Sequence, residues 1–488
     1  MPQNIPGITI LGLGPASADY LTRQAFDWLQ RISEVYVRTR KHPVVDGLPK
    51  SLVVHSFDHL YEQSEDFSEV YEMIIQNILD LGKRSQGVTY AVPGHPFVAE
   101  ATCPEIIKRA KKLNIPVHVI EGMSFLEPVL TALGIDPFPQ ITLIDALDLA
   151  NANHPAFPPG IPALIAQLYS RQVASEVKMT LMEVFPDDHP VILVHGAGTE
   201  NQIVEDLPLY EIDRSRHIDI LSTIYIPPLS PDTSFESFQE TIAHLRAPHG
   251  CPWDREQTHQ TLRTNLLEET YEVLAALDAE APDSLKEELG DLLLQIVLHA
   301  QIAFEDGEFT MEDVIQAINR KLIHRHPHVF GDLKVEGVKG VLKNWEKLKE
   351  AERKTNGQES SRGLLDGVPK ILPALNQAQE YQSRAARVGF DWDDIQGVWD
   401  KMYEELDEIK NAKNDAERAS ELGDLLFAVV NLVRWLKVDA ESALRQTNLK
   451  FFKRFRYIEL QAQQQGLDLG KMTLKEMDVL WEEAKKQE

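Results

Sequence analysis

The second half of the chain contains one acidic helical pattern twice, and this repeat constrains the fold more than any other feature. Residues 268–272 read Glu-Glu-Thr-Tyr-Glu, and residues 288–291 read Glu-Leu-Gly-Asp. Residues 404–408 read Glu-Glu-Leu-Asp-Glu, and residues 421–424 read Glu-Leu-Gly-Asp. Side chains three residues apart share a helix face, so each copy predicts two helices that carry paired carboxylates. Each copy is therefore expected to form an all-α module.

Packing two such helices antiparallel would gather four carboxylates in each copy. Like charges at close range are unfavourable unless cations lie among them, and oxygen ligands suit Mg²⁺ or Mn²⁺. Divalent metals held by carboxylates are typical of phosphate chemistry. The acids concerned are Glu269, Glu272, Glu288 and Asp291 in the first copy and Glu405, Glu408, Glu421 and Asp424 in the second.

The composition narrows the function classes. The net charge of -27 disfavours non-specific binding to nucleic acid, so no nucleic-acid polymer is expected as a partner. No apolar run reaches the ~18 residues of a membrane span, and no secretion signal is visible. Two cysteines, Cys103 and Cys251, favour a reducing compartment, so a cytoplasmic location without membrane attachment is expected.

The chain before residue 227 alternates short apolar runs with helical patterns, which predicts an α/β region with a largely parallel sheet. The expected strands cover residues 8–12, 35–37, 88–92, 117–120, 161–166, 191–194 and 220–226. The helical patterns between several of them cover residues 21–31, 68–81 and 99–113.

Strand patterns nearly vanish after the proline-rich segment 227–231, which is expected to be a linker. Helical periodicity then covers residues 235–245, 258–277, 284–304, 311–324 and 341–354, and it resumes from residue 369 to the end. Polar residues 354–363 predict a second linker. The expected domains are residues 1–228 (α/β), 232–355 (all-α) and 366–488 (all-α).

The helical half resembles the MazG family of nucleoside triphosphate pyrophosphohydrolases. The resemblance rests on both acidic repeats, on residues 250–254 (Gly-Cys-Pro-Trp-Asp), on residues 325–330 (Arg-His-Pro-His-Val-Phe) and on residues 388–392 (Val-Gly-Phe-Asp-Trp). It covers roughly residues 232–488. It implies an all-α, Mg²⁺-dependent enzyme that converts a nucleoside triphosphate to the monophosphate and pyrophosphate and works as a homodimer.

The same resemblance implies roles for individual residues. The eight repeat acids would be metal ligands, and Glu404 or Glu268 would orient or deprotonate the attacking water. The nucleotide would contact Lys401, Lys450, Arg454 and Trp481 in the second copy and Lys321 and Arg325 in the first. Both copies keep all four acids, so the residues do not decide whether one copy or both are active. The histidines at 324, 326 and 328 lack metal-ligand spacing, which favours a surface or capping role over Zn²⁺.

The N-terminal region resembles the tetrapyrrole methylases, which bind S-adenosylmethionine between two α/β subdomains. The resemblance rests on residues 10–15 (Ile-Leu-Gly-Leu-Gly-Pro), 90–100 and 120–125, each after a predicted strand, and covers about residues 5–228. It implies a cofactor pocket lined by Pro15, Pro93, Gly94, His95 and Ser124. Two positions depart from the family pattern, because Ala16 replaces a glycine and His95 replaces an acid.

The whole architecture then resembles the YabN-type fusion of a tetrapyrrole methylase domain with tandem MazG domains. The predicted activity is Mg²⁺-dependent hydrolysis of nucleoside triphosphates, joined to a methylase-like domain whose acceptor the sequence does not identify. One alternative is a methyltransferase whose helical half is regulatory. A second is a nucleotide sensor or dimerisation module that binds without releasing pyrophosphate.

Overall fold

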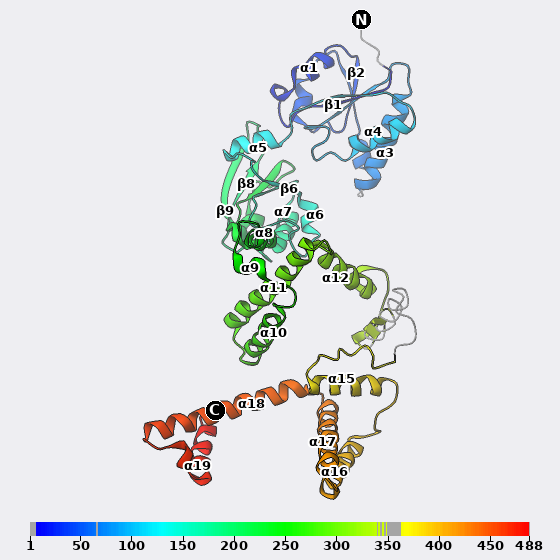
Figure 1. Cartoon of the computed structure of the whole chain (residues 1–488). Helices are drawn as coiled ribbons and strands as arrows, with labels where there is room; N and C mark the ends of the chain where they lie inside the picture. The colour runs from blue at the N-terminus through cyan, green and yellow to red at the C-terminus, as the bar shows by residue number, and fades with distance from the viewer. Residues whose placement is uncertain are drawn as a thin grey trace. The chain divides into compact units, whose positions relative to one another are not determined.

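The computed structural model describes residues 6–64, 67–338, 340–341, 344–345, 348 and 363–487. The chain forms two compact units, Met1–Glu256 and Gln257–Glu488 (Figure 1). The helix expected over residues 341–354 and the linker expected over 354–363 lie largely outside the described residues. The boundaries expected from the sequence for the three domains stay predictions.

The first unit begins with a five-stranded parallel sheet in the order β3-β2-β4-β1-β5. Its strands are β1 (Ile8–Gly12), β2 (Glu34–Val37), β3 (Val53–Ser56), β4 (Val88–Val92) and β5 (Val117–Ile120). The helices between them are α1 (Arg23–Leu29), α2 (Asp58–Tyr61), α3 (Phe67–Gly82) and α4 (Thr102–Lys112). The parallel sheet expected for this region is confirmed here.

Helices cover both faces of this sheet. Ile10 and Tyr90 pack with Ile74 of α3 and Ile106 of α4 on one face. Residues of α1 pack with Leu11 and its neighbours on the other face. β1 and β4 are buried along their whole length, which explains why both are mostly apolar in the sequence.

The second sheet has the order β6-β7-β10-β8-β9, and only its β6–β7 pair is parallel. Its strands are β6 (Thr142–Asp145), β7 (Ala163–Ala166), β8 (Pro190–His195), β9 (Ile203–Pro208) and β10 (Ser222–Ile226). The prediction of a largely parallel sheet is wrong for this part. The connection from β8 to β9 is too short for the crossover that parallel pairing needs, so these strands pair as a hairpin.

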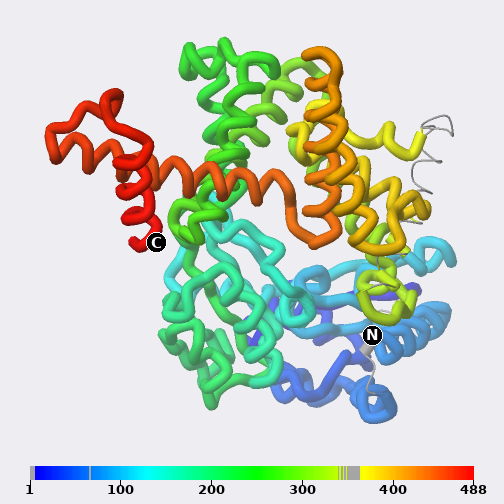
Figure 2. Tube along the Cα trace, turned by 90° about the horizontal axis from the view of Figure 1, so that it is seen from below, coloured from blue at the N-terminus to red at the C-terminus, as the bar shows by residue number. Residues whose placement is uncertain are grey.

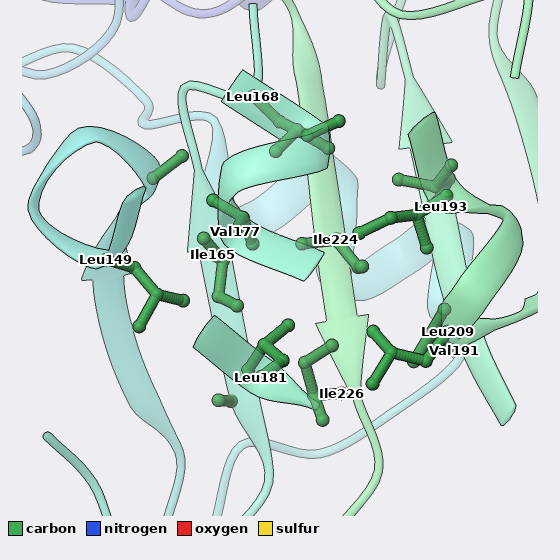
Figure 3. Packing of buried hydrophobic residues seen from close by; sticks show 14 of the residues in the cluster. Leu149, Ile165, Leu168, Val177, Leu181, Val191, Leu193, Leu209, Ile224 and Ile226 are labelled. Atoms are coloured by element: carbon green, nitrogen blue, oxygen red, sulfur yellow. The ribbon is translucent and has the colours of Figure 1, made fainter. Parts of the chain in front are cut away.

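One face of the second sheet carries a core with α6 (Ala146–Ala150) and α7 (Arg171–Leu181). Figure 3 shows Val177 and Leu181 of α7 packed against Ile165, Ile224 and Ile226 of the strands, and all five residues are almost fully buried. Burying side chains of this size stabilises the fold by about 1.5–3 kcal/mol each before ordering entropy is subtracted. The opposite face packs against α5 (Leu126–Leu133).

The expected linker at residues 227–231 packs onto the second sheet's subdomain instead of standing free. The Leu229 amide donates to the Pro159 carbonyl, and the His189 ring bonds the Pro227 carbonyl. Leu229 also packs against the core of Figure 3. Helices α8 (Phe235–Arg246) and α9 (Pro252–Glu256) follow and belong to the first compact unit.

The described part of the second unit is helical, as expected. Its first half contains α10 (Arg263–Asp278), α11 (Pro282–Glu305), α12 (Met311–Arg325) and α13 (Pro327–Phe330). Its second half contains α15 (Ala374–Arg387), α16 (Ile395–Asn411), α17 (Asp415–Trp435), α18 (Ala440–Gln464) and α19 (Leu474–Lys485). None of the helices in the described ranges combines the length and apolarity of a membrane span.

Candidate functional site

The first acidic cluster lies where α10 and α11 pack against each other. Carboxylate oxygens of Glu269, Glu272 and Glu288 lie within 4.8 Å of one another. Asp291 is on the same face of α11, one turn beyond Glu288, and its charge helps to raise the pKa of Glu269. The structure therefore brings together the four acids that the sequence analysis selected in this copy.

The second acidic cluster lies at the matching place on α16 and α17. Carboxylate oxygens of Glu405, Glu408 and Glu421 again lie within 4.8 Å of one another. Asp424 lies one turn beyond Glu421 and helps to raise the pKa of that carboxyl. Glu405 is only 3% exposed, and its Oε2 atom is buried with no hydrogen-bond partner among the described residues.

The electrostatics of the two clusters match. Partial burial, followed by the charges of the neighbouring acids, raises the pKa of Glu269, Glu288 and Glu421. Each raised pKa means that the ionised form of that carboxyl is disfavoured where it lies. A bound cation would remove the repulsion, so the shared pattern of shifts fits a divalent metal in each cluster.

The two copies differ in one basic residue beside the acids. Lys401 Nζ lies 2.8 Å from Glu405 Oε1 and 3.1 Å from Glu404 Oε1, and these bonds raise the pKa of the ammonium. Aligning Glu269 with Glu405 puts Asn265 at the position of Lys401, so the first copy has no cation there. Glu404 and Glu268, the candidate bases, are both exposed and lie outside the close carboxylate groups.

Each predicted nucleotide-binding arginine lies against a tryptophan, which is the predicted Trp481 in the second copy and Trp345, not among the predicted residues, in the first. The Arg325 guanidinium lies 5.5 Å from the Trp345 ring centre, and that of Arg454 lies 5.4 Å from the Trp481 ring centre. Lys321 and Lys450 each stand one helical turn before the arginine. In Figures 1 and 2 the distal part of α18, with α19, extends away from the α16–α17 hairpin. This pair therefore lies on a part of the chain, α18 and α19, other than the two helices that carry the second acidic cluster.

Other motif residues of the helical half have structural roles. Asp391 Oδ1 accepts hydrogen bonds from Arg434 Nη2 at 2.7 Å and from Trp435 Nε1 at 3.1 Å, which ties residues 388–392 to the end of α17. His326 ends α12 and bonds the Leu322 carbonyl, so it has the capping role that the sequence analysis favoured over a metal ligand.

The three predicted loops of the N-terminal domain meet at the carboxyl edge of the first sheet. Gly14 and Gly94 exchange backbone hydrogen bonds of 3.2 and 2.8 Å. A Cβ atom at Gly12 would lie 2.5 Å from the Gly122 nitrogen and 2.7 Å from the Gly94 carbonyl oxygen. Only glycine fits such close backbone contact, which explains the glycines after β1, β4 and β5. Ligands of open parallel sheets bind at this edge.

The residues predicted to line the cofactor pocket differ in their burial and in their hydrogen bonds. Pro15 is buried, whereas Pro93 and Gly94 are half-buried. His95 Nδ1 accepts a hydrogen bond from the Phe97 amide, so this ring shapes its own loop. Ser124 Oγ donates to Glu127 at 2.6 Å and accepts from the Leu126 amide, so it supports the start of α5. The structure thus uses His95 and Ser124 to shape the loops.

Comparison with known proteins defines the class of each half. Residues 7–213 match the tetrapyrrole (corrin/porphyrin) methylases, and residues 257–330 match the MazG nucleotide pyrophosphohydrolase domain. A nucleoside triphosphate pyrophosphohydrolase/pyrophosphatase MazG of Thermotoga maritima is 47% identical over 51% of this chain and 95% of its own length. A nucleoside triphosphate pyrophosphohydrolase of Escherichia coli is also 47% identical, with the same coverage.

The match to one relative extends over the whole chain. The uncharacterized protein YabN of Bacillus subtilis is 44% identical over 99% of both chains. The chain therefore belongs to the YabN family, in which a tetrapyrrole methylase domain is fused to MazG-type helical modules.

Proposed function

We propose that the helical half is a nucleoside triphosphate pyrophosphohydrolase that depends on Mg²⁺, with Mn²⁺ as an alternative ion. The observation that carries the proposal is the pair of carboxylate clusters on α10–α11 and α16–α17. Relatives that match about half of this chain carry the name of that activity. The products would be the nucleoside monophosphate and pyrophosphate.

The residues of each cluster fit a hard divalent cation. Carboxylate oxygens are the ligands that Mg²⁺ prefers, and the unpartnered Glu405 Oε2 is a buried acceptor that a cation would satisfy. The bound ion would supply charge stabilisation to the phosphoryl oxygens. Among the chain's own groups, Glu404 or Glu268 would orient the attacking water. The lysine and arginine pairs would hold the phosphates where a second copy of the chain brings them to a cluster.

The second copy is the better candidate for the active one. It has the more deeply buried acid, Glu405, and within the described ranges only this copy has a cation, Lys401, paired with that acid. Lys401 would hold one oxygen of Glu405 in place while the other oxygen stays available for the metal. Asn265 cannot provide this charge in the first copy.

We also propose that the protein is a homodimer. Apolar side chains near the acids are exposed on both hairpins, among them Leu289 and Leu293 on α11 and Leu422 and Leu426 on α17. A Cβ added at Gly290 or Gly423 would meet no atom within 4 Å, so contacts within the described chain do not explain the glycine in either Leu-Gly-Asp motif. A second helix pair packed on each face would bury these side chains and use the space beside the glycines.

The test of this function is pyrophosphate release from a panel of nucleoside triphosphates. We expect release in Mg²⁺ and none in excess EDTA, because hydrolysis would need the ion held by the acids. We also expect metal affinity to strengthen as the pH rises through and beyond the usual range of a glutamate, because acids whose pKa is raised must lose protons before they bind the ion. Nucleotide binding without pyrophosphate release from the folded protein would favour the sensor alternative.

We propose a second function, binding of S-adenosylmethionine by the N-terminal domain. The observation that favours it is the meeting of three glycine loops at the carboxyl edge of a parallel sheet. This domain would make the protein a methyltransferase if an acceptor also binds.

We propose a cytoplasmic location, because the two cysteines, Cys103 and Cys251, are unpaired and a reducing compartment keeps thiols in that state.

Calorimetric titration of the full chain with S-adenosylmethionine tests the second function. We expect saturable binding that persists in EDTA, because the three loops contain none of the acids of the metal clusters. ATP should not compete, since its proposed site lies in the other unit of the chain. Titration without a binding signal would remove the cofactor proposal and leave the hydrolase proposal unaffected.

A further inference from the structure

The segment Arg38–His42 follows β2 at the same edge of the first sheet as the three glycine loops. β2 pairs in parallel with β4, so the chain leaves both strands at that edge. Glycines mark the loops after β1, β4 and β5 in the sequence. The segment after β2 has no glycine, although it contacts two of those loops.

His42 lies against the first loop. It is 7% exposed, it hydrogen-bonds the backbone of Pro15, and its Nδ1 is buried with no partner among the described residues. Because Nδ1 has no partner, we assign the interaction with Pro15 to Nε2, which would donate its hydrogen since a proline backbone offers only a carbonyl acceptor. Burial lowers the pKa of His42 to about 4, so the ring is neutral near pH 7.

Arg38 reaches the end of the second loop. Its Nη1 bonds the Glu100 carboxylate, its Nη2 bonds the Tyr71 hydroxyl at 2.8 Å, and its Nε bonds the Tyr61 hydroxyl at 3.0 Å. Glu100 Oε1 accepts a further bond of 2.9 Å from the Thr102 amide. The Glu100 side chain is 2% exposed. A buried ion pair with this many partners holds the attached backbone in one geometry.

The second loop needs such support, because its own backbone is strained at one residue. Ala99, next to Glu100, has a φ of 53°, a region that residues with a Cβ rarely adopt. The helical turn η2 (Pro43–Gly47) begins directly after His42 and packs on the turn η1 (Ala18–Tyr20) that follows the first loop. The segment thus lies between both loops and the elements that flank them.

We propose that Arg38–His42 is a positioning segment, in which His42 holds the first glycine loop through Pro15 and Arg38 holds the second through Glu100. The role in ligand binding rests on the proposed S-adenosylmethionine site, whereas the role in loop order does not. His42 and Arg38 are positioning residues, because their contacts are to the loops and not to a ligand.

Hydrogen exchange of the full chain, followed by mass spectrometry, tests the role of His42. His42→Leu removes the donor, and we expect exchange over residues 13–18 to rise by about tenfold. His42→Gln keeps an N–H donor and should restore most of the protection. The dissociation constant for S-adenosylmethionine should follow the same order, about tenfold weaker for the leucine variant only.

His189 provides a matched control. It is 8% exposed, and its Nε2 bonds the Pro227 carbonyl at 2.8 Å in the second sheet's subdomain. His189→Leu removes the same kind of bond, yet it should leave exchange over residues 13–18 and cofactor binding unchanged.

Arg38→Lys tests the second loop. It should raise exchange over residues 94–100 but not over 13–18, because lysine keeps the positive charge and loses the several N–H donors of the guanidinium.

Two results would overturn the proposal. One is unchanged exchange over residues 13–18 in His42→Leu or over 94–100 in Arg38→Lys. The other is an equal rise over residues 13–18 in His189→Leu, which would show a general loss of stability. A wild-type chain that does not bind S-adenosylmethionine would count against the proposed function alone, since the exchange measurement still decides the role of the segment.

Discussion

Replacing Glu421 and Asp424 together with alanine is expected to lower kcat/KM for Mg²⁺-dependent pyrophosphate release by at least about a thousandfold. Glu421 shares a carboxylate cluster with Glu405 and Glu408, and Asp424 lies one turn further along the same face of α17. Removing both acids takes away half of the ligands proposed for this cluster. Steady-state kinetics over a range of Mg²⁺ concentrations would also detect a variant that only binds the metal more weakly.

The first copy offers the matched control for that experiment. Glu288 and Asp291 occupy the corresponding positions on α11, and Glu288 belongs to the equivalent cluster. If the second copy is the catalyst, the Glu288→Ala/Asp291→Ala variant should retain activity within a few-fold of the wild type. Loss of activity in this variant alone would transfer the active site to the first copy. Full activity in both double variants would contradict a catalytic role for either cluster.

The strands that the sequence predicted and the strands that it missed differ in their place in the sheets. β1 and β4 are interior strands and fully buried, and apart from Thr9, Gly12 and Thr89 they consist of aliphatic and aromatic residues. The missed strands, β3, β6 and β9, all lie at sheet edges, and β5 is the one edge strand that the sequence predicted. β9 is half exposed and carries two acids among its six residues, which hides the strand pattern. Pairing with a neighbour, and not local composition, makes these segments strands.

The candidate sites also include residues that the sequence predicted and residues that it did not. The acidic clusters were predictable because spacing along one helix fixes which side chains share a face, and two such helices needed only to pack. Arg38 and Glu100 are 62 residues apart, and no local pattern indicates that they form an ion pair. Their position after neighbouring parallel strands was the available signal, because both segments leave the sheet at one edge.

Gly122→Ala is expected to destabilise the first unit by about 3 kcal/mol or more, beyond the usual effect of adding a methyl group. A Cβ at this position would overlap the Gly94 carbonyl oxygen and lie 2.7 Å from the Gly12 carbonyl carbon. Both obstacles are backbone atoms of the other two loops, so no side chain can rotate away to relieve the clash. The free energy of unfolding from denaturant titration, followed by a signal from the first unit, measures the effect.

Gly134→Ala separates this steric effect from the general effect of replacing a glycine in the same unit. Gly134 ends α5 with a φ of 66°, and a Cβ there would meet no atom within 4 Å. Its replacement should therefore lower stability by only about 1–2 kcal/mol, from backbone strain alone. S-adenosylmethionine binding should survive in Gly134→Ala and be lost in Gly122→Ala, because only Gly122 lies where the three loops meet. Equal stability losses in the two variants would show that the close contact among Gly12, Gly94 and Gly122 relaxes easily, and the rigid three-loop site would have to be abandoned.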